Sequence, residues 1–342
     1  MLSRTADNLF WMCRYIERAE NTARMLDVNL QMSLLPQDAQ TREGSWNAVL
    51  RISELQGLYR AKHDVISPHD VLQYMVRDPE NPSSIYTCMR AARENARAVR
   101  GSLTTEVWET YNTTWLELLK HLHTGLLERN PGEFFEWVKF RSHLARGVTI
   151  GTMLEDEALY FLRIGMHLER ADNTARMLDV KFHERDGSGA APPNGSQQQQ
   201  QQQDGRVDGN GGGNNGATSG LQSEFYRWSA LLSSVSGLEI YRKVYRDVIT
   251  PDRVAELLIL HPDMPRSLLA SMRAVSEDLA RVSNQRSTET QRRAGMLCAE
   301  LQFGRVEDIL QSGLHQYLEH FLDRINDLGN RISQDFLVPL SA

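Results

Sequence analysis

Apolar residues recur at steps of three and four through most of the chain. Between Arg4 and Leu30, for example, Trp11, Tyr15 and Leu26 fall on one face. Residues at these steps lie on one side of an α-helix, so the pattern predicts a long amphipathic helix. Comparable patterns predict further helices at about 105–128, 133–150, 154–184, 223–246, 265–284, 288–311 and 314–336. Alternating strand-like runs are absent from the sequence, and the pattern therefore predicts an all-α helical bundle.

Prolines and capping residues mark several helix boundaries. Ser67-Pro68-His69-Asp70 combines a Ser N-cap, Pro at the first helical position and an acid in the first turn, and Thr250-Pro251-Asp252 repeats the arrangement. Residues 78–82 contain two prolines, which remove backbone donors and restrict the preceding residues. We therefore expect this stretch to be non-helical and the next helix, capped by Ser83 or Ser84, to run to about residue 99.

One stretch of twelve residues occurs twice with a single change. Residues 17–28 read ERAENTARMLDV, and residues 169–180 read ERADNTARMLDV. The change, Glu20 to Asp172, keeps the charge. A repeat of this length indicates a duplicated helical unit.

The repeat extends beyond this motif. Trp46 matches Trp228 at an offset of 182, and Pro82 matches Pro265 at an offset of 183, whereas the motif itself has an offset of 152 (169 − 17). About thirty residues are therefore inserted in the second copy. We expect two tandem repeats, at 1–152 and 153–342, related by a pseudo-two-fold axis.

The insertion is visible as a low-complexity segment at 186–222. It contains Pro192-Pro193, seven glutamines at 197–203 and a tract rich in Gly and Asn. Without apolar periodicity, such a segment cannot offset its ordering entropy by burial. We expect a disordered loop that interrupts the second repeat.

Composition narrows the class of protein. The net charge of the 342 residues is −6, which disfavours a nucleic-acid partner. Cys13, Cys88 and Cys298 are isolated, as is typical of the reducing cytoplasm. No run of about eighteen apolar residues could span a membrane. We expect a soluble cytoplasmic protein without nucleic-acid or membrane partners.

The repeated motif places polar side chains on one stripe of each helix. At about 100° per residue, Glu17, Asn21 and Arg24 share a stripe opposite the apolar face, with Arg18 at its margin. The second copy repeats this arrangement. The candidate ligand- or partner-binding residues are therefore Glu17, Arg18, Asn21, Arg24, Glu169, Arg170, Asn173 and Arg176.

Three interpretations of the stripe remain open. It could be a solvated face with pairs such as Glu20 and Arg24 at the favourable i,i+4 spacing. It could be a buried polar seam where the two copies dock, or a ligand or catalytic site that combines carboxylate, amide and guanidinium. A solvated face needs no particular amide, so the recurrence of Asn21 at Asn173 favours the second and third interpretations.

Motifs of known chemistry are missing from the sequence. Walker, GxSxG and HExxH motifs do not occur, and neither does the Glu-x-x-His motif of di-iron helical bundles. The sequence therefore predicts no metal site and no cofactor, and it identifies no catalytic residue.

At these residues the chain resembles the bacterial alpha-E domain proteins, a helical family with a Glu-Arg motif. The resemblance is close over MLSRTADNLFWMCRYIERAENTAR and again over LYFLRIGMHLERADNTARMLDV. It assigns the motif to Glu17/Arg18 and Glu169/Arg170. It also implies partnership with circularly permuted ATP-grasp proteins and transglutaminase-like proteins in a peptide-ligation or peptide-modification system.

The resemblance leaves three hypotheses for function. The protein is an accessory or scaffold subunit that binds a peptide substrate or an ATP-grasp ligase, with the motif arginines gripping carboxylates. Alternatively, it is itself an enzyme in which Glu17 or Glu169 acts as general base. A third hypothesis is a purely structural assembly module without a ligand.

Overall fold

The structure, a computed structural model, describes residues 1–35, 39–186 and 215–337. Within these ranges it is all-helical and contains no strand. The first eight α-helices are α1 (Ser3–Ser33), α2 (Ala39–Ile52), α3 (Gln56–Arg60), α4 (Pro68–Arg77), α5 (Ile85–Ala98), α6 (Thr105–His123), α7 (Leu126–Arg129) and α8 (Pro131–Thr152), with a 3-10 turn at Arg100–Ser102. The next eight are α9 (Glu157–Asp186), α10 (Asn215–Ser234), α11 (Leu238–Tyr245), α12 (Pro251–Ile259), α13 (Leu268–Arg281), α14 (Thr288–Phe303), α15 (Val306–Ser312) and α16 (Leu314–Phe336).

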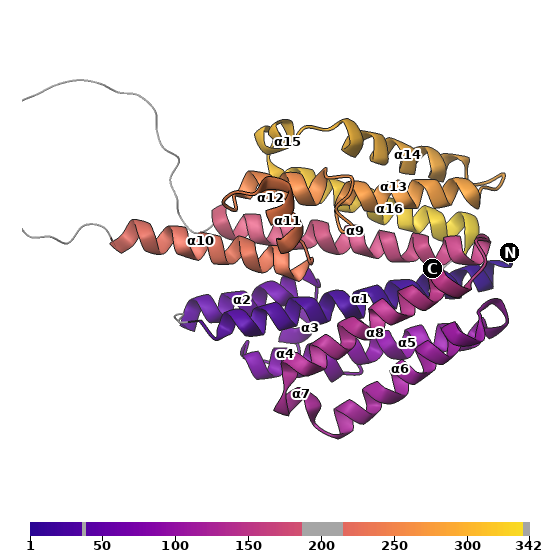
Figure 1. Cartoon of the computed structure of the whole chain (residues 1–342), viewed down its shortest axis with the longest axis horizontal. Helices are drawn as coiled ribbons and strands as arrows, with labels where there is room; N and C mark the ends of the chain where they lie inside the picture. Colours follow the sequence, from indigo (N-terminus) through magenta and orange to yellow (C-terminus); the bar gives the residue numbers. More distant parts are fainter. Residues whose placement is uncertain (36–38, 187–214, 338–342) are drawn as a thin grey trace, which may run out of the picture.

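The two long helices α1 and α9 lie side by side at the centre of the molecule. Figure 1 shows α1 to α8 in the lower half of the view and α9 to α16 in the upper half. Helices α5 and α8 pack against α1, and α13 and α16 pack against α9. The motif helices therefore form the boundary between the two halves.

A glycine allows the two central helices to approach closely. A Cβ atom at Gly165 of α9 would lie 2.2 Å from the carbonyl oxygen of Phe10 in α1. Such a distance is far inside van der Waals contact, so only glycine fits at this crossing. The close approach brings the motif residues on the following turns of both helices within reach of one another.

The buried residues of the two halves correspond in detail. Trp46 and Trp228 are both fully buried, as are Tyr59 and Tyr241. The hydroxyl of Tyr59 donates to the Val65 carbonyl at 3.1 Å, and that of Tyr241 donates to the Val248 carbonyl at 2.9 Å. The tryptophans and tyrosines that recur in the sequence thus anchor the core of each half.

The expected helix caps are present in most cases. The side chain of Ser67 accepts a hydrogen bond from the Asp70 amide, and the side chain of Ser84, rather than Ser83, caps α5. Thr250 precedes Pro251 as expected, but its side chain makes no capping hydrogen bond. Asp78–Pro82 lies between α4 and α5 and is non-helical.

Three helices expected as continuous are broken. The helix expected at 105–128 ends at His123, because Gly125 adopts φ 69° and starts the separate α7. The helix expected at 223–246 is interrupted at 235–237, where Ser236 has φ 53°, and the helix expected at 288–311 is interrupted at Gly304. Gly125 and Ser236 lie in the left-handed region, which ends an α-helix by redirecting the chain, whereas Gly304 is extended, with φ −68° and ψ 154°.

The predicted insertion is shorter than expected. Residues 215–222 belong to α10, so the expectation of a disordered segment up to residue 222 is wrong for its last eight positions. A helix with a packed section extends at little further entropic cost, which explains the early start. Residues 187–214 of the predicted insertion lie outside the described residues. No helix in the described part of the chain is long and apolar enough to cross a membrane.

Candidate functional site

The two Glu-Arg motifs pair with each other across the contact between α1 and α9. The Glu17 carboxylate accepts from Nε and Nη2 of Arg170 at 2.9 and 3.0 Å. Reciprocally, Glu169 accepts from Nε and Nη2 of Arg18 at 2.5 and 3.0 Å. Both pairs are bidentate, the geometry in which a guanidinium binds a carboxylate most strongly.

Helical geometry explains why the pairing is reciprocal. Adjacent residues of a helix point about 100° apart, so Glu17 and Arg18 cannot face each other. Each side chain reaches the opposite helix instead, and the same holds for the second motif. The placement of Arg18 at the margin of the stripe is what directs its guanidinium to Glu169.

Around Glu17 lies a larger network, the first-half cluster, consisting of Glu17, Glu20, Asn21, Arg24, Ser142, Arg146, Arg170 and Arg266. Nη2 of Arg146, from α8, lies 3.1 Å from Glu17 Oε2 and 2.7 Å from Glu20 Oε2. Ser142 donates to Glu20 Oε2 at 2.6 Å, and Arg24 donates to Glu20 Oε1 at 2.9 Å. Every carboxylate oxygen of this cluster accepts at least two hydrogen bonds.

Arg266 reaches the first-half cluster from the loop between α12 and α13. Its guanidinium donates to Glu17 Oε1 at 3.0 Å, to Asn21 Oδ1 at 2.7 Å and to Glu20 Oε1 at 2.6 Å. The loop itself is fixed to α9, because the Arg266 carbonyl accepts from the hydroxyl of Thr174 at 3.0 Å. Both the backbone carbonyl and the guanidinium of Arg266 are therefore fixed by hydrogen bonds.

Around Glu169 lies another network, the second-half cluster, consisting of Arg14, Arg18, Glu54, Glu169, Asp172, Asn173 and Arg176. Arg14 donates to Glu169 Oε2 at 2.8 Å, and Arg176 grips Asp172 through two hydrogen bonds of 2.9 and 3.0 Å. Arg176 also pairs with the exposed Glu54.

Burial and charge act in opposite directions on the motif carboxylates. Burial raises the pKa of the Glu17 carboxyl, but the charges of Arg170, Arg266 and Arg146 outweigh it and lower the pKa to about 2. For Glu169, burial is likewise outweighed, by Arg18 and Arg14, and the pKa is lowered to about 2. The pKa of Glu20 is also held well below its usual range. All three carboxylates are therefore anionic at neutral pH.

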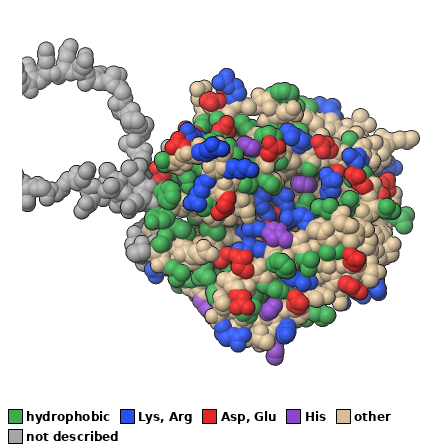
Figure 2. Space-filling model, in the orientation of Figure 1, with side chains coloured by type: hydrophobic (Ala, Val, Ile, Leu, Met, Phe, Trp, Pro, Cys, Tyr) green, Lys and Arg blue, Asp and Glu red, His purple; other side chains and the backbone are tan. Residues whose placement is uncertain are grey.

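A polar pocket of about 220 Å³ opens beside the second-half cluster. Its lining includes Arg14, Arg18, Asn21, Thr22, Ser83, Glu169, Asp172, Asn173, Arg176 and Asn326. The amide nitrogen of Asn21 is buried here and has no hydrogen-bond partner in the described part of the chain. Figure 2 shows Lys/Arg and His side chains gathered near the middle of one face of the molecule. A buried donor without a partner is costly, which makes the pocket a candidate binding site.

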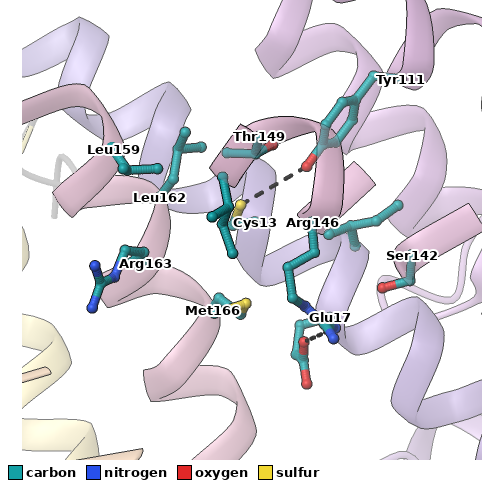
Figure 3. A pocket seen from close by; sticks show the side chains of 12 residues that line it. Cys13, Glu17, Tyr111, Ser142, Arg146, Thr149, Leu159, Leu162, Arg163 and Met166 are labelled. Carbon is teal, nitrogen blue, oxygen red and sulfur yellow. Dashed lines mark hydrogen bonds and ion pairs between the residues drawn. The ribbon is translucent and has the colours of Figure 1, made fainter. Parts of the chain in front are cut away.

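A second, much smaller cavity has Glu17 in its wall (Figure 3). Its volume of about 30 Å³ suits a water molecule rather than a ligand. Cys13 lies in its wall, with its sulfur 3.8 Å from the hydroxyl of Tyr111. Burial raises the pKa of this thiol to about 12, so the thiolate form is negligible at neutral pH.

The described structure distinguishes among the interpretations of the stripe. Glu17, Asn21, Glu169 and Arg170 are buried, so the solvated-face interpretation is wrong for them. Arg24, Arg176 and Asn173 are only partly buried, and Arg24 reaches the ring of His143 at 3.0 Å. The carboxylates of the stripe join the two halves, whereas Asn21 and Asn173 face the pocket.

Three arginines of the two clusters correspond to a residue other than arginine in the opposite repeat, and the sequence pattern does not predict them as site residues. At the repeat offsets, Arg14 corresponds to Met166, Arg146 to Gly329 and Arg266 to Ser83. Self-comparison of the sequence detects only what is duplicated, so it passes over these arginines. The ion pairs expected at the i,i+4 spacing are present, because Arg24 donates to Glu20 and Arg176 donates to Asp172.

Metal chemistry finds no support in the same region. Among residues 1–35, 39–186 and 215–337, no group of three or more His, Cys, Asp or Glu side chains could hold a metal ion. The carboxylates of the two clusters are paired with guanidiniums.

Comparison with known proteins agrees with the motif geometry. No curated protein and no solved structure matches this chain. Residues 1–337 match the Alpha-E family, described as a predicted alpha-helical domain with a conserved ER motif. The ER pairs Glu17/Arg18 and Glu169/Arg170 of this chain are those that form the reciprocal ion pairs. The chain belongs to the Alpha-E family.

Proposed function

We propose that this protein is an accessory or scaffold subunit of a cytoplasmic peptide-ligation or peptide-modification system. It acts with a circularly permuted ATP-grasp protein, and with a transglutaminase-like protein, by binding a peptide substrate or the ligase. The observation that carries the proposal is the pocket of about 220 Å³ beside the ion-paired seam. Arg14, Arg18 and Asn21 line this pocket, and carbonyl or carboxylate oxygens of a peptide are acceptors for the two guanidiniums.

The protein consists of two tandem alpha-E repeats, at 1–152 and 153–342, related by a pseudo-two-fold axis. Support comes from the order of the helices, since a 31-residue α1 and a 30-residue α9 each begin a series of eight. The reciprocal pairs Glu17–Arg170 and Glu169–Arg18 are what a two-fold relation between α1 and α9 would produce. A ligand would then bind near the axis, where residues of both repeats converge.

An enzymatic role for Glu17 or Glu169 has less support. A general base works best with a pKa near neutral pH, whereas the pKa of each of these carboxyls is lowered to about 2. The hydrogen bonds from arginines also occupy their oxygens. A purely structural role accounts for the ion pairs but leaves the buried donor of Asn21 without a purpose.

Co-purification tests the proposal. The full-length chain is expressed together with the circularly permuted ATP-grasp protein of the same organism, and the tagged chain is recovered. A Ser83→Trp variant fills the pocket without removing a side-chain hydrogen bond of Ser83 and should lose the partner or the peptide. Gln302→Trp, on the exposed end of α14, is the matched control and should retain both. Failure of the unmodified chain to retain the ATP-grasp protein, the transglutaminase-like protein or a peptide would refute the proposal.

A further inference from the structure

The loops that precede α5 and α13 correspond residue by residue. Pro82 matches Pro265 at an offset of 183, and at the same offset Ser84 matches Ser267. The side chains of both serines cap the helix that follows, so the local geometry agrees with the sequence register. Between each proline and its serine lies one residue, Ser83 in the first loop and Arg266 in the second.

In the first-half cluster, Arg266 fills a site built from three acceptors. Its guanidinium donates to Glu17 Oε1, Asn21 Oδ1 and Glu20 Oε1 at 2.6–3.0 Å. The side chain is buried at this position, with only 7% of its surface exposed. In this protein, two carboxylates and one amide oxygen together thus bind a guanidinium.

The same three acceptors recur in the second-half cluster, where no arginine fills the site. At the motif offset of 152 they are Glu169, Asn173 and Asp172. Ser83 occupies the place of Arg266, and its short side chain leaves the pocket of about 220 Å³ that all four residues line. The pocket is thus lined by the counterparts of the three acceptors of Arg266 and by the residue that corresponds to Arg266 in sequence.

The hydrogen-bonding capacity of these acceptors is only partly used. Oε1 of Glu169 accepts one hydrogen bond, from Arg18, whereas Oε1 of Glu17 accepts two. Each oxygen of Asp172 likewise accepts one, from Arg176. Asn173 makes no side-chain hydrogen bond within the described ranges. A carboxylate oxygen has two lone pairs, so acceptor positions remain for a ligand.

The balance of charge also leaves room for a cation. In the first-half cluster, two carboxylates face four guanidiniums, those of Arg24, Arg146, Arg170 and Arg266. In the second-half cluster, three carboxylates face three guanidiniums, those of Arg14, Arg18 and Arg176. One further guanidinium would leave the second cluster less positive than the first already is.

We propose that this pocket binds the guanidinium of an arginine side chain in a peptide, in the manner in which the first-half cluster binds Arg266. The guanidinium donates to Glu169, Asp172 and Asn173, which line the pocket. The inference rests on the proposed function in taking a peptide as the ligand, and it adds the residue that the peptide must contain.

Calorimetric titration with short peptides tests this inference. The full-length chain is titrated with acetyl-Ala-Arg-Ala-amide and with acetyl-Ala-citrulline-Ala-amide, which has the same shape without the charge. We expect the arginine peptide to bind at least about tenfold more tightly, because charge-assisted hydrogen bonds to carboxylates are stronger than neutral ones. Equal affinities for the two peptides, or no binding of either, would overturn the inference.

Three variants test whether the peptide binds in the pocket. Ser83→Arg supplies the missing arginine from the chain itself, so it should abolish binding of the arginine peptide and raise the melting temperature, whereas Ser83→Ala should leave binding intact. Asp172→Asn removes an acceptor charge and should weaken binding of the arginine peptide at least about fivefold, even if Ser83→Arg does not fold. A folded Ser83→Arg protein with unchanged peptide affinity would contradict the inference.

The outcomes also separate this inference from the proposed function. If a partner co-purifies but the arginine peptide does not bind, the inference fails and the proposed function stands. If the arginine peptide binds with the expected selectivity while neither the ATP-grasp nor the transglutaminase-like protein co-purifies, partnership fails and the arginine site stands.

Discussion

Glu17 and Arg170 lie 153 residues apart in the sequence and are joined by two parallel hydrogen bonds of 2.9 and 3.0 Å. The second copy of the motif repeats this relation in reverse, since Glu169 is gripped by Arg18. Each half of the molecule therefore contributes one carboxylate and one guanidinium that the other half needs. A change in either motif leaves a buried charge without its partner, which explains why the chain carries the Glu-Arg pair in both copies.

Removing one carboxylate should destabilise the whole protein. Glu17→Ala leaves the buried Arg170 without its counter-charge and leaves Arg266 and Arg146 with Glu20 alone, and we expect the free energy of unfolding to fall by about 3–5 kcal/mol. Urea denaturation followed by circular dichroism measures the change.

The matched control for this variant is Glu307→Ala. Glu307 is exposed at the start of α15 and forms only a long contact of 3.7 Å with Arg305, so its loss should change stability by less than about 0.5 kcal/mol. A Glu17→Ala protein that unfolds at the same urea concentration as the control would show that the network is not structural.

The fold class follows from the sequence because the apolar period of 3.6 extends through long segments. The helix breaks at Gly125 and Gly304 do not follow, because the same period continues on both sides of each break. Whether one glycine continues a helix or ends it depends on how the flanking segments pack, and packing is not encoded in the local pattern.

The candidate site was predictable only where the chain repeats itself. Glu17 and Glu169 stand in identical stretches, so their shared role could be expected from the residues alone. Arg146 and Arg266 join them from distant helices and loops, and their counterparts are Gly329 and Ser83. The pocket exists because of this difference between the two halves, which no pattern within either half indicates.

The two motif arginines should differ in their tolerance of lysine. Lysine keeps the charge but cannot form two parallel hydrogen bonds with a carboxylate. The side chain of Arg170 is only 6% exposed, against 26% for Arg18. We expect Arg170→Lys to lower the free energy of unfolding by about 1.5–3 kcal/mol and Arg18→Lys by less, because water can replace part of the lost bonding at Arg18. Equal losses in urea denaturation would contradict the role assigned to burial.

Acid should weaken the seam over a defined range of pH. The pKa of Glu17 and that of Glu169 are both lowered to about 2 in the folded protein, below the ordinary value of 4.5. Their contribution to stability is therefore complete above pH 4.5 and is lost as the pH falls toward 2. Urea denaturation at pH 5, 4 and 3 should show this loss. Glu17→Gln, which cannot titrate, should show a shallower decline, and an identical decline in both proteins would contradict the assignment.

The three thiols should differ in reactivity. Burial raises the pKa of Cys13 and of Cys88 to about 12, whereas Cys298 is only partly buried. Burial also raises the pKa of Cys298, so it is access to the reagent that favours this thiol. Titration of the native protein with a disulfide reagent at pH 8 should therefore release one fast equivalent, which Cys298→Ser removes. A fast equivalent that persists in Cys298→Ser would show that one of the two buried thiols opens to solvent.

Asp278 should destabilise the folded protein at neutral pH. Its side chain in α13 is 1% exposed, and it pairs with Arg163, whose Nε lies 3.0 Å from Oδ2 without the alignment of a hydrogen bond. Burial outweighs the charge of Arg163 and raises the pKa of Asp278 from 3.8 to about 6.

Because its pKa is raised, the Asp278 carboxyl binds its proton more tightly in the folded state than in the unfolded state. Stability should fall as the pH rises from about 4 to 6, by up to about 3 kcal/mol for this group. Asp278→Asn is uncharged at every pH, so it should lack this decline and should be more stable than the unmodified chain at pH 7. Urea denaturation of both proteins at pH 4, 5, 6 and 7 measures the difference. Parallel curves across this range would mean that Asp278 is ionised in the fold at its ordinary pKa and that Arg163 compensates its burial.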